Sequence, residues 1–340
     1  ADITSILIEL TTEEAKYLVL LIDTKLAAEI ISTLDSDDRK KFLKNFTSKE
    51  IAQYINVIDS DDAVDILNEQ PVKVREEVIA LLKDREQARF IIDLMHYDED
   101  CAGGLMQKEL IKINISQTVT ECVEEIRKQA EDVEKVYSVY VIDDDGKLLG
   151  TVSLKKIILA KRGSKIADVY EDDEIVSVQT YASGEEVADL MQKYDLEAIP
   201  VIDELGRLVG RITIDDIVDV IREEAEKDYQ LAAGISNDVE ADDSIWELTK
   251  ARIPWLFLGL IGGVGAAAIM GGFENLIQKY AILFFFTPLI AAMAGNVGVQ
   301  SSAIVVQGIA NDDVKGSIGQ RVFKEMLLAL LNGTILAVIL

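Results

Sequence analysis

The sequence predicts a multi-domain protein made of an all-α superhelical N-terminal domain, an α+β tandem repeat, a long connecting helix and an incomplete α-helical transmembrane domain. Three observations predict this order. Short amphipathic patterns fill the first hundred residues, a segment then occurs twice at an offset of 60 residues, and uncharged apolar runs follow Arg252. The boundaries that we expect are residues 1–100, 101–225, 226–251 and 252–340, with the repeats at 101–165 and 166–225.

The acidity of the chain belongs to its first three quarters. Residues 1–250 hold 29 Lys and Arg against 57 Asp and Glu, whereas residues 251–340 hold 5 against 4. So acidic a surface repels nucleic acid, because a polyanion needs Lys and Arg to displace its counterions. We therefore expect cations as partners and no nucleic acid.

Cysteine and histidine usage excludes several functional classes. Cys101 and Cys122 have the spacing of neither a disulfide framework nor a zinc site, and His96 is the only histidine. The chain has no nucleophile-base pair and no phosphate-cradling glycine loop, so it predicts no enzyme. Since the N-terminus has no initiator Met and no signal-peptide pattern, we expect that Ala1 is not the natural start.

The N-terminal region predicts short stacked helices over residues 5–95. Two stretches, TLDSDDRKKFLKNF and VIDSDDAVDILNEQ, repeat Ser-Asp-Asp at a spacing of 24 residues, as in a small helical superhelix. These acids could bind metal. Helix N-capping is the simpler interpretation, because Ser and Asp are preferred cap residues.

The tandem repeat is clearest in VYVIDDDGKLLGTVSLKKII from Val139 and IPVIDELGRLVGRITIDDIV from Ile199, which align without a gap. Each copy predicts a strand, an Asp-x-x-Gly turn, a strand and a helix, and another helix precedes it, so the unit is β-α-β-β-α. Over residues 104–224 this pattern resembles a tandem CBS pair.

The CBS resemblance implies a nucleotide site that would hold a ribose and a phosphate. Gly210, Thr213 and Asp216 of the second copy match the family pattern, whereas Lys156 stands in place of the Asp in the first copy. The alternative is that Thr213 and Asp216 only cap the following helix.

The last part predicts membrane helices at about 253–273, 280–310 and 320–340, joined to the CBS pair by an acid-rich connecting helix. The third apolar run continues to Leu340, so we expect the sequence to end inside a helix. Arg252, Lys315, Arg321 and Lys324 outnumber Lys279, and the positive-inside rule therefore places the acidic N-terminal region in the cytoplasm.

The second membrane segment is unusual because polar residues interrupt it. Asn296 and Gln300 would cost free energy in lipid without a partner, so they must face protein or water. We expect Pro288 to break the helix, and Gly295 and Gly298 to permit exposed carbonyls, as in a pore-lining segment. A tight helix-packing seam is the alternative.

Four stretches together resemble the MgtE family of magnesium channels. PLIAAMAGNVGVQSSAIVVQG resembles its second membrane helix, YDEDCAGGLM the junction between its N-domain and CBS pair, EEAEKDYQLAAGI the start of its plug helix, and GGFENLI the end of its first span. The resemblance covers essentially the whole chain. It implies a homodimeric Mg²⁺ channel of the inner membrane, with five membrane helices per subunit, that closes when intracellular Mg²⁺ bridges the acidic cytosolic domains.

Site residues follow from the same resemblance. Gly295 would offer a pore carbonyl, and Asn296, Gly298 and Gln300 would shape the filter or its packing, although Val299 departs from the polar residue of some members. The family's pore carboxylate lies on the fifth helix, beyond Leu340. The acids that we nominate for Mg²⁺ sensing are Asp98, Glu99, Asp100, Asp216, Asp219, Glu223, Glu224 and Asp228.

Two other functions stay open at this point. One is a membrane-tethered CBS regulator that senses a nucleotide such as ATP and conducts no ion. The other is a transporter of Mn²⁺ or Co²⁺, which carboxylate and carbonyl ligands alone do not exclude.

Overall fold

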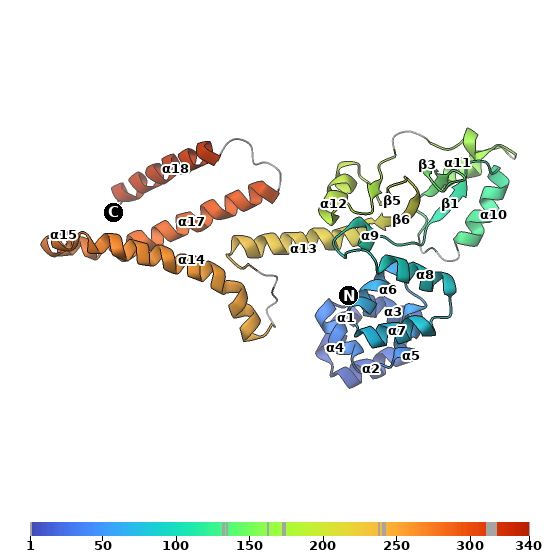
Figure 1. Cartoon of the computed structure of the whole chain (residues 1–340), viewed down its shortest axis with the longest axis horizontal. Helices are drawn as coiled ribbons and strands as arrows, with labels where there is room; N and C mark the ends of the chain where they lie inside the picture. Colours follow the sequence, from blue (N-terminus) through green and yellow to red (C-terminus); the bar gives the residue numbers. More distant parts are fainter. Residues whose placement is uncertain are drawn as a thin grey trace. The chain divides into compact units, whose positions relative to one another are not determined.

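A computed structural model describes residues 2–130, 133, 135–161, 163–171, 175–236, 239, 243–310 and 318–339 (Figure 1). The chain forms two compact units, Ala1–Ile221 and Arg222–Leu340. The two units are described separately below.

The described residues before Met95 fold into eight short helices, as the sequence predicts. They are α1 (Asp2–Glu9), α2 (Thr12–Leu21), α3 (Thr24–Ser32), α4 (Ser36–Leu43), α5 (Ser48–Ile55), α6 (Ser60–Asn68), α7 (Val72–Leu81) and α8 (Arg85–Leu94). Helices two apart in the chain pack together, α2 on α4, α3 on α5, α5 on α7 and α6 on α8. Each can bury only one face, so the stack forms a superhelix around a shared apolar core.

The Ser-Asp-Asp stretches do not cap their helices in the predicted way. The N-caps of α4 and α6 are Asp35 and Asp59, and neither side chain makes a capping hydrogen bond. Ser60 instead donates from its hydroxyl to Glu109 Oε2 at 2.7 Å and accepts from the Lys108 N–H at 3.0 Å. The capping interpretation is therefore wrong for both helices, and Ser60, the first residue of α6, contacts the junction instead.

Two β-α-β-β-α units follow, as the repeat predicts. The first contains β1 (Ile111–Asn114), α10 (Val119–Gln129), β2 (Val139–Ile142), β3 (Leu148–Val152) and α11 (Leu154–Leu159). The second contains β4 (Val178–Gln179), α12 (Gly184–Lys193), β5 (Ala198–Ile202), β6 (Leu208–Thr213) and α13 (Ile214–Ala232). In both units the first strand pairs parallel with the second, and the second pairs antiparallel with the third.

The Asp-x-x-Gly turns have the same geometry in the two repeats. Asp143 Oδ1 and Asp203 Oδ1 each accept hydrogen bonds from the backbone N–H groups two and four residues further along, at 2.8 to 2.9 Å. Gly146 and Gly206 have φ of +81° and +78°, which favour glycine over any residue with a Cβ. The identical turns confirm that the two segments are structural copies.

A short helix, α9 (Ala102–Leu105), joins the N-terminal helices to the repeats, and its glycines permit a close approach of the chain. A Cβ at Gly104 would lie 2.2 Å from the carbonyl oxygen of Asp98, and one at Gly103 would lie 2.3 Å from the Tyr97 ring. The Gly103 N–H also donates to the carbonyl of Thr180 at 2.8 Å. The glycine pair therefore lets the 98–100 acids fold back against α9 beside the second repeat.

One apolar core unites the N-terminal helices with the second repeat. It includes Ile55 and Leu67 from the helices, Met106 from the junction, and Ile212 and Ile217 from the second repeat. The first repeat has a separate core around Ile113 and Val141. Burial of this shared apolar surface, at roughly 25 cal/mol per Å², holds α6 against the start of α13.

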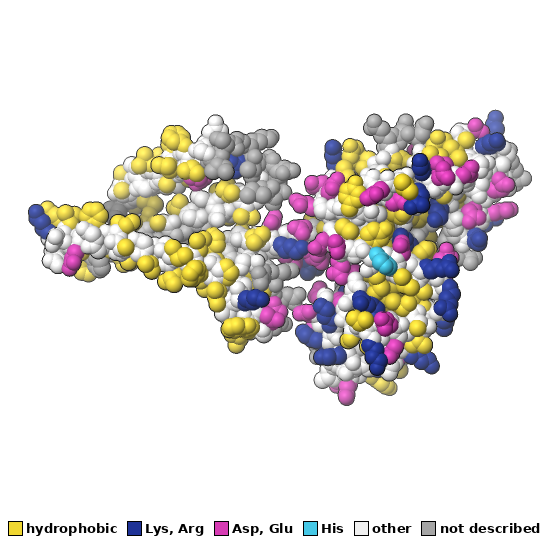
Figure 2. Space-filling model, viewed as in Figure 1, with side chains coloured by type: hydrophobic (Ala, Val, Ile, Leu, Met, Phe, Trp, Pro, Cys, Tyr) yellow, Lys and Arg dark blue, Asp and Glu magenta, His cyan; other side chains and the backbone are white. Residues whose placement is uncertain are grey.

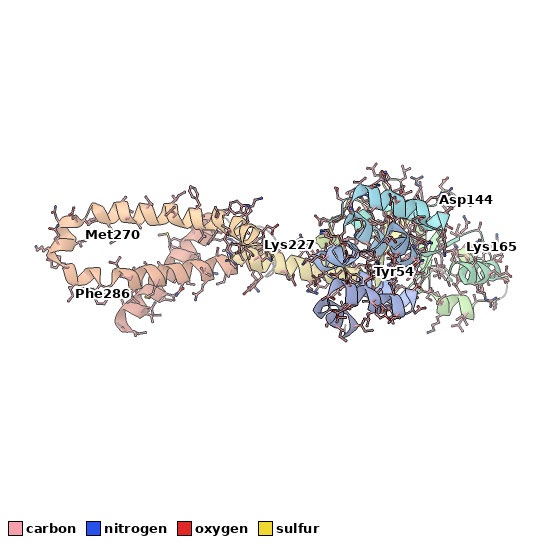
Figure 3. The ribbon with its side chains drawn as sticks, turned by 90° about the horizontal axis from the view of Figure 1, so that it is seen from below. Tyr54, Asp144, Lys165, Lys227, Met270 and Phe286 are labelled. Carbon is pink, nitrogen blue, oxygen red and sulfur yellow. The ribbon has the colours of Figure 1, made fainter. Side chains whose placement is uncertain are left out.

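The second unit is α-helical and apolar on its outside. After the end of α13 it contains α14 (Ile245–Gly271), α15 (Glu274–Lys279), α16 (Ala281–Phe284), α17 (Thr287–Ala310) and α18 (Ile318–Ile339). Three of these helices, α14, α17 and α18, are long and apolar enough to cross a membrane. Figure 2 shows hydrophobic side chains over their outer surface, and Figure 3 shows Met270 and Phe286 at the turn between α14 and α17.

The membrane segments differ from the prediction at two prolines. The uncharged run from Tyr280 is not one helix, since α16 ends at Phe284 and α17 begins at Thr287. Pro288 lies in the first turn of α17, where its missing N–H costs no helical hydrogen bond, so it does not break the helix. Conversely, the helix expected at about 253–273 begins earlier, at Ile245, and runs through Pro254. The predicted loop residue Lys315 lies outside the described residues.

Candidate functional site

The first turns of two helices bring a set of carboxylates together in the first unit. Asp61 and Asp62 begin α6, and Asp215 and Asp216 begin α13. Their electrostatic interactions, together with those of two neighbours one turn further along, define what we call the α6–α13 acid cluster: Asp61, Asp62, Asp65, Asp215, Asp216 and Asp219. The positive ends of both helix dipoles lie at this cluster and favour anionic side chains there.

Burial and mutual repulsion make these carboxylates resist ionisation. Burial, and then the charge of Asp216, raises the pKa of Asp61 well above its usual value. Burial raises the pKa of Asp216 to about 6, although a hydrogen bond from the Thr213 hydroxyl at 2.7 Å opposes the rise. Loss of hydration first, and then the charges of Asp62 and Glu99, raise the pKa of Asp65 to about 7 as well, although the residue as a whole is exposed and solvent screens its charge. Asp61 and Asp216 are therefore the pair that most needs a cation.

The cation whose charge acts on Asp62 and Asp65 already has other partners. Arg39, itself 8% exposed, donates to both carboxylate oxygens of Glu69 at 2.7 to 3.1 Å and to the Ser32 carbonyl at 2.7 Å. Its charge lowers the pKa of Asp62 and Asp65, but burial outweighs that effect at both. The cluster therefore keeps an excess of negative charge.

The donor set suits a hard divalent cation. Carboxylate oxygens are preferred by Mg²⁺, which keeps several of its waters and is commonly held by one or two carboxylates. Among the described residues, no group of three His, Cys, Asp or Glu side chains is close enough to enclose one ion. The arrangement therefore suits a hydrated ion between two helices better than a dehydrated ion in a closed cage.

The structure places some predicted sensing residues in or beside the cluster. Asp216 and Asp219 belong to it, and the charge of Glu99 contributes to the raised pKa of Asp65. Glu99 Oε1 also accepts from Asn68 Nδ2 at 3.0 Å.

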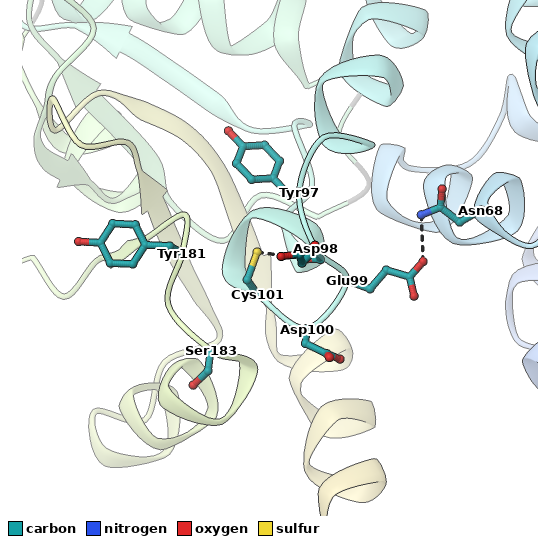
Figure 4. A pocket seen from close by; sticks show the side chains of 8 residues that line it. All are labelled: Asn68, Tyr97, Asp98, Glu99, Asp100, Cys101, Tyr181 and Ser183. Atoms are coloured by element: carbon teal, nitrogen blue, oxygen red, sulfur yellow. Dashed lines mark hydrogen bonds between the residues drawn. The ribbon is translucent and has the colours of Figure 1, made fainter. Parts of the chain in front are cut away.

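Asp98, Glu99 and Asp100 line a separate open cavity of about 760 Å³ (Figure 4). Its other walls come from both the N-terminal helices and the second repeat. They are Asn68, Tyr97, Cys101, Tyr181 and Ser183. The carbonyl of Asp98 accepts from Cys101 Sγ at 3.1 Å, which helps to hold the acidic loop in place.

The other three predicted acids lie beyond the first unit. Glu223, Glu224 and Asp228 are on the part of α13 that belongs to the second unit, and Glu224 Oε1 accepts from Lys227 Nζ at 3.1 Å.

Sequence reasoning missed Asp65 and Asp215, and it preferred helix capping to metal binding for Asp61 and Asp62. The available signal was the repeated Ser-Asp-Asp, in which Asp37 and Asp61 occupy equivalent positions 24 residues apart. Asp37 is exposed, whereas Asp61 is 9% exposed and faces Asp216. Only the packing of α6 against the second repeat distinguishes the two.

The residues predicted for a nucleotide are occupied by internal contacts. A Cβ at Gly210 would lie 2.6 Å from Met106 Sδ, so this glycine makes room for the junction. Thr213 is 2% exposed, and both its hydroxyl and its N–H donate to Asp216 Oδ2. This geometry agrees with the alternative that Thr213 and Asp216 stabilise the start of α13.

The predicted pore residues lie on one continuous helix in the second unit. Gly295, Asn296, Gly298 and Gln300 are all exposed on α17, and no described atom lies within 4 Å of a Cβ built at either glycine. One turn away, the Ser301 hydroxyl donates to Glu325 Oε2 of α18 at 2.7 Å. Gly295 and Gly298 therefore have open space beside them in the described part of this chain, and Asn296 and Gln300 are exposed.

Family comparisons match three parts of the chain. Residues 1–100 match the MgtE intracellular N domain, residues 102–163 and 166–223 match CBS domains, and residues 287–340 match the family described as divalent cation transporter.

Curated relatives match most of the chain. The Magnesium transporter MgtE of Thermus thermophilus is 36% identical over 335 residues, which are 96% of this chain and 74% of that protein. The Magnesium transporter MgtE of Enterococcus faecalis is 35% identical over 251 residues. The chain spans 55% of the length of the latter and of a relative from Bacillus subtilis.

Solved structures resemble the first unit. A crystal structure of the cytosolic domain of the Mg²⁺ channel MgtE in complex with ATP has a TM-score of 0.60 and 33% identity, covering 64% of this chain and 89% of that one. The soluble part of a magnesium transporter has a TM-score of 0.59 and 30% identity, covering 65% and 87%.

The raised pKa values predict that stability falls with pH when divalent cations are absent. Asp216 titrates near 3.8 in the unfolded chain and at about 6 in the folded chain. Its favourable contribution is therefore complete below pH 4 and is lost as the pH rises through 6. Asp216→Asn should raise the free energy of unfolding at pH 8 by on the order of 1 to 2 kcal/mol and change it little at pH 4. Urea unfolding followed by circular dichroism measures both values.

Asp37→Asn is the matched control, because Asp37 occupies the equivalent position on α4 but is exposed. It should leave the pH dependence unchanged. The same pH slope in Asp216→Asn as in the unmodified protein would contradict the account of the cluster.

Proposed function

Because the chain belongs to the MgtE family of magnesium transporters, we propose that it conducts Mg²⁺ across a membrane and that its acidic region senses Mg²⁺ and closes the pore. The observation that carries the sensing proposal is the α6–α13 acid cluster, in which Asp61 and Asp216 are held together against their charge. Only a cation or a proton can relieve that repulsion.

Mg²⁺ would act at the cluster by binding the packed arrangement more tightly than an open one. In the packed state the charge of Asp216 on α13 raises the pKa of Asp61 on α6, and the charge of Asp62 on α6 raises the pKa of Asp216, so one hydrated ion can interact with carboxylates of both helices. If α6 moved away, each carboxylate would meet the ion alone. The ion therefore shifts the population toward the packed state, and its loss frees the N-terminal helices.

The signal would reach the membrane helices along the chain itself. Asp216 is in the first turn of α13, and this helix continues without a break to Ala232. There Gly234, with φ of +79°, turns the chain against the Trp255 ring. The Ser236 hydroxyl then donates to the Ala251 carbonyl at 2.9 Å, which couples the turn to α14. A change at α13 can thus be transmitted to the first membrane helix.

The pore is proposed to form between two copies of the chain in the cell membrane, with the N-terminal region in the cytoplasm. The exposure of Asn296 and Gln300 on α17 supports this, because these side chains need water, an ion or another helix beside them in a bilayer. Gly295 and Gly298 would let a partner helix or a hydrated ion approach the backbone.

ATP is a further proposed ligand of the CBS pair, since the cytosolic domain of a relative was solved in complex with it. Met106 lies against Gly210, and Thr213 is buried with its hydroxyl donating to Asp216, so we do not assign ATP to these three residues.

Limited proteolysis across a Mg²⁺ titration tests the sensor. Millimolar Mg²⁺ should protect the junction at residues 95–110 in the purified protein, because the ion stabilises the packed state. K⁺ should give no protection. Asp61→Asn and Asp216→Asn should each raise the half-protecting Mg²⁺ concentration by about tenfold, the loss expected for one charged ligand worth roughly 1.4 kcal/mol.

Asp37→Asn supplies the control here too and should behave like the unmodified protein. Protection that does not depend on Mg²⁺ would refute sensing at the α6–α13 acid cluster. The same half-protecting Mg²⁺ concentration in Asp61→Asn, Asp216→Asn and Asp37→Asn would refute it too.

Ion flux into liposomes tests conduction and selectivity. We expect Mg²⁺ uptake that Asn296→Leu reduces at least about tenfold, since an apolar side chain removes a polar contact in the pore. Val299→Ala on the same helix is the control and should retain uptake. Uptake of Mn²⁺ or Co²⁺ in preference to Mg²⁺ would identify a different divalent-cation transporter, and tight ATP binding without any flux would favour the nucleotide-sensing regulator.

A further inference from the structure

A buried polar pair, Gln107 and Arg211, adjoins the α6–α13 acid cluster at Asp61. Gln107 is 6% exposed and Arg211 is 3% exposed. Their backbones form a reciprocal bridge, in which the Gln107 N–H donates to the Arg211 carbonyl at 2.8 Å and the Arg211 N–H donates back at 3.0 Å. The bridge fixes the start of both side chains, one from the junction and one from β6.

The guanidinium of Arg211 determines which way the Gln107 amide points. Arg211 Nε and Nη2 both donate to Gln107 Oε1, at 3.1 and 2.8 Å. A guanidinium has donors only, so the amide must turn its oxygen toward Arg211 and its NH₂ group away. Arg211 is itself held by the Lys135 carbonyl at 3.1 Å and by the Tyr137 ring, whose centroid is 5.4 Å from Cζ.

The NH₂ group of Gln107 is thereby directed at the cluster. Gln107 Nε2 donates to Asp61 Oδ2 at 3.3 Å, while Asp61 Oδ1 accepts from the Asp62 N–H at 3.0 Å. Both carboxylate oxygens are thus held, and rotation of the carboxylate is opposed from two sides. The positive charge of Arg211 polarises the amide between them and strengthens its hydrogen bond to Asp61.

We propose that Gln107, oriented by Arg211, is a positioning residue that sets the Asp61 carboxylate for Mg²⁺ and so gives the sensor its preference for Mg²⁺ over Ca²⁺. This inference rests on the proposed sensing function. The physical reason is the difference between the two ions. Mg²⁺ demands a near-ideal octahedron with ligands at roughly 2.1 Å, whereas Ca²⁺ accepts longer and more variable geometries. A fixed carboxylate therefore favours Mg²⁺, whereas a mobile carboxylate can bind either Mg²⁺ or Ca²⁺.

The same pair also links the cluster to the interior of the tandem repeat. Arg211 lies between the strands of the second copy and the Lys135–Tyr137 segment of the first copy. Displacement of that segment would release the Gln107 amide and loosen Asp61. Arg211 donates its side-chain hydrogen bonds to Gln107 and to the Lys135 carbonyl, so it acts on the ion through Gln107.

The test measures half-protecting concentrations of Mg²⁺ and of Ca²⁺ in limited proteolysis of the whole purified protein. Gln107→Leu should raise the Mg²⁺ concentration about threefold to tenfold, as expected for losing one hydrogen bond to a charged group. The Ca²⁺ concentration should change less than about twofold, because Ca²⁺ tolerates a mobile ligand. The preference for Mg²⁺ therefore falls, which a purely structural role would not cause.

Gln87→Leu is the matched control. Gln87 is also a part-buried glutamine, and it donates to the Ile55 and Ile58 carbonyls at 2.7 and 3.0 Å, away from the cluster. Its loss should lower thermal stability and leave the ratio of the two ion concentrations unchanged.

Arg211→Lys keeps the buried positive charge but removes the paired N–H donors that hold Gln107 Oε1. It therefore tests the orienting role without removing the charge at this position. It should weaken the Mg²⁺ response in the presence of Gln107 and have no further effect in Gln107→Leu, because it acts through that side chain. If the unmodified protein responds to Mg²⁺ but Gln107→Leu leaves the ratio of the half-protecting Mg²⁺ and Ca²⁺ concentrations unchanged, this inference alone is overturned. An unmodified protein that does not respond to Mg²⁺ would overturn the sensing function and this inference together.

Discussion

Repulsion between Asp61 and Asp216 is the constraint on which the rest of the first unit depends. Asp61 in the first turn of α6 is buried, and the charge of Asp216 in the first turn of α13 makes it harder to ionise, while the charges of Asp215 and Asp62 do the same to Asp216. The apolar core that α6 shares with the second repeat supplies the opposing force. The packed state is therefore stable only while apolar packing, a bound proton or a bound metal ion outweighs the repulsion. Because these opposing free energies nearly cancel, a small change in cation concentration shifts the population between the packed and open states.

The segment after α9 makes this balance specific. Lys108 Nζ pairs with Asp93 at 2.6 Å, and Ser60 bonds both the Lys108 N–H and Glu109, so the junction is attached to the N-terminal helices at several points. Gln107 in the same segment faces Asp61. The residues that tie the N-terminal helices to the second repeat thus also position the carboxylate that a cation would bind, which couples ion binding to the docking of the helices.

Much of the fold could be predicted from the sequence, because residues close together in the chain determine those helices, strands and turns. The Asp143 and Asp203 turns, the two β-α-β-β-α units and the apolar spans need only neighbouring residues to specify them. The acid cluster could not be predicted in this way. Asp37 and Asp61 share the same local sequence, and only the distant β6–α13 segment buries one of them. Pro288 was misjudged for a related reason, since its effect depends on where the helix begins.

The most direct measurement is anomalous X-ray diffraction from crystals of the protein grown with Mn²⁺, which takes the same octahedral oxygen ligands as Mg²⁺. The account predicts a peak between Asp61 and Asp216 that weakens when Mg²⁺ is added in excess and disappears in Asp61→Asn. An anomalous map with no peak there, or with Mn²⁺ only at Asp98–Asp100, would contradict the claim that the α6–α13 acid cluster is the magnesium sensor.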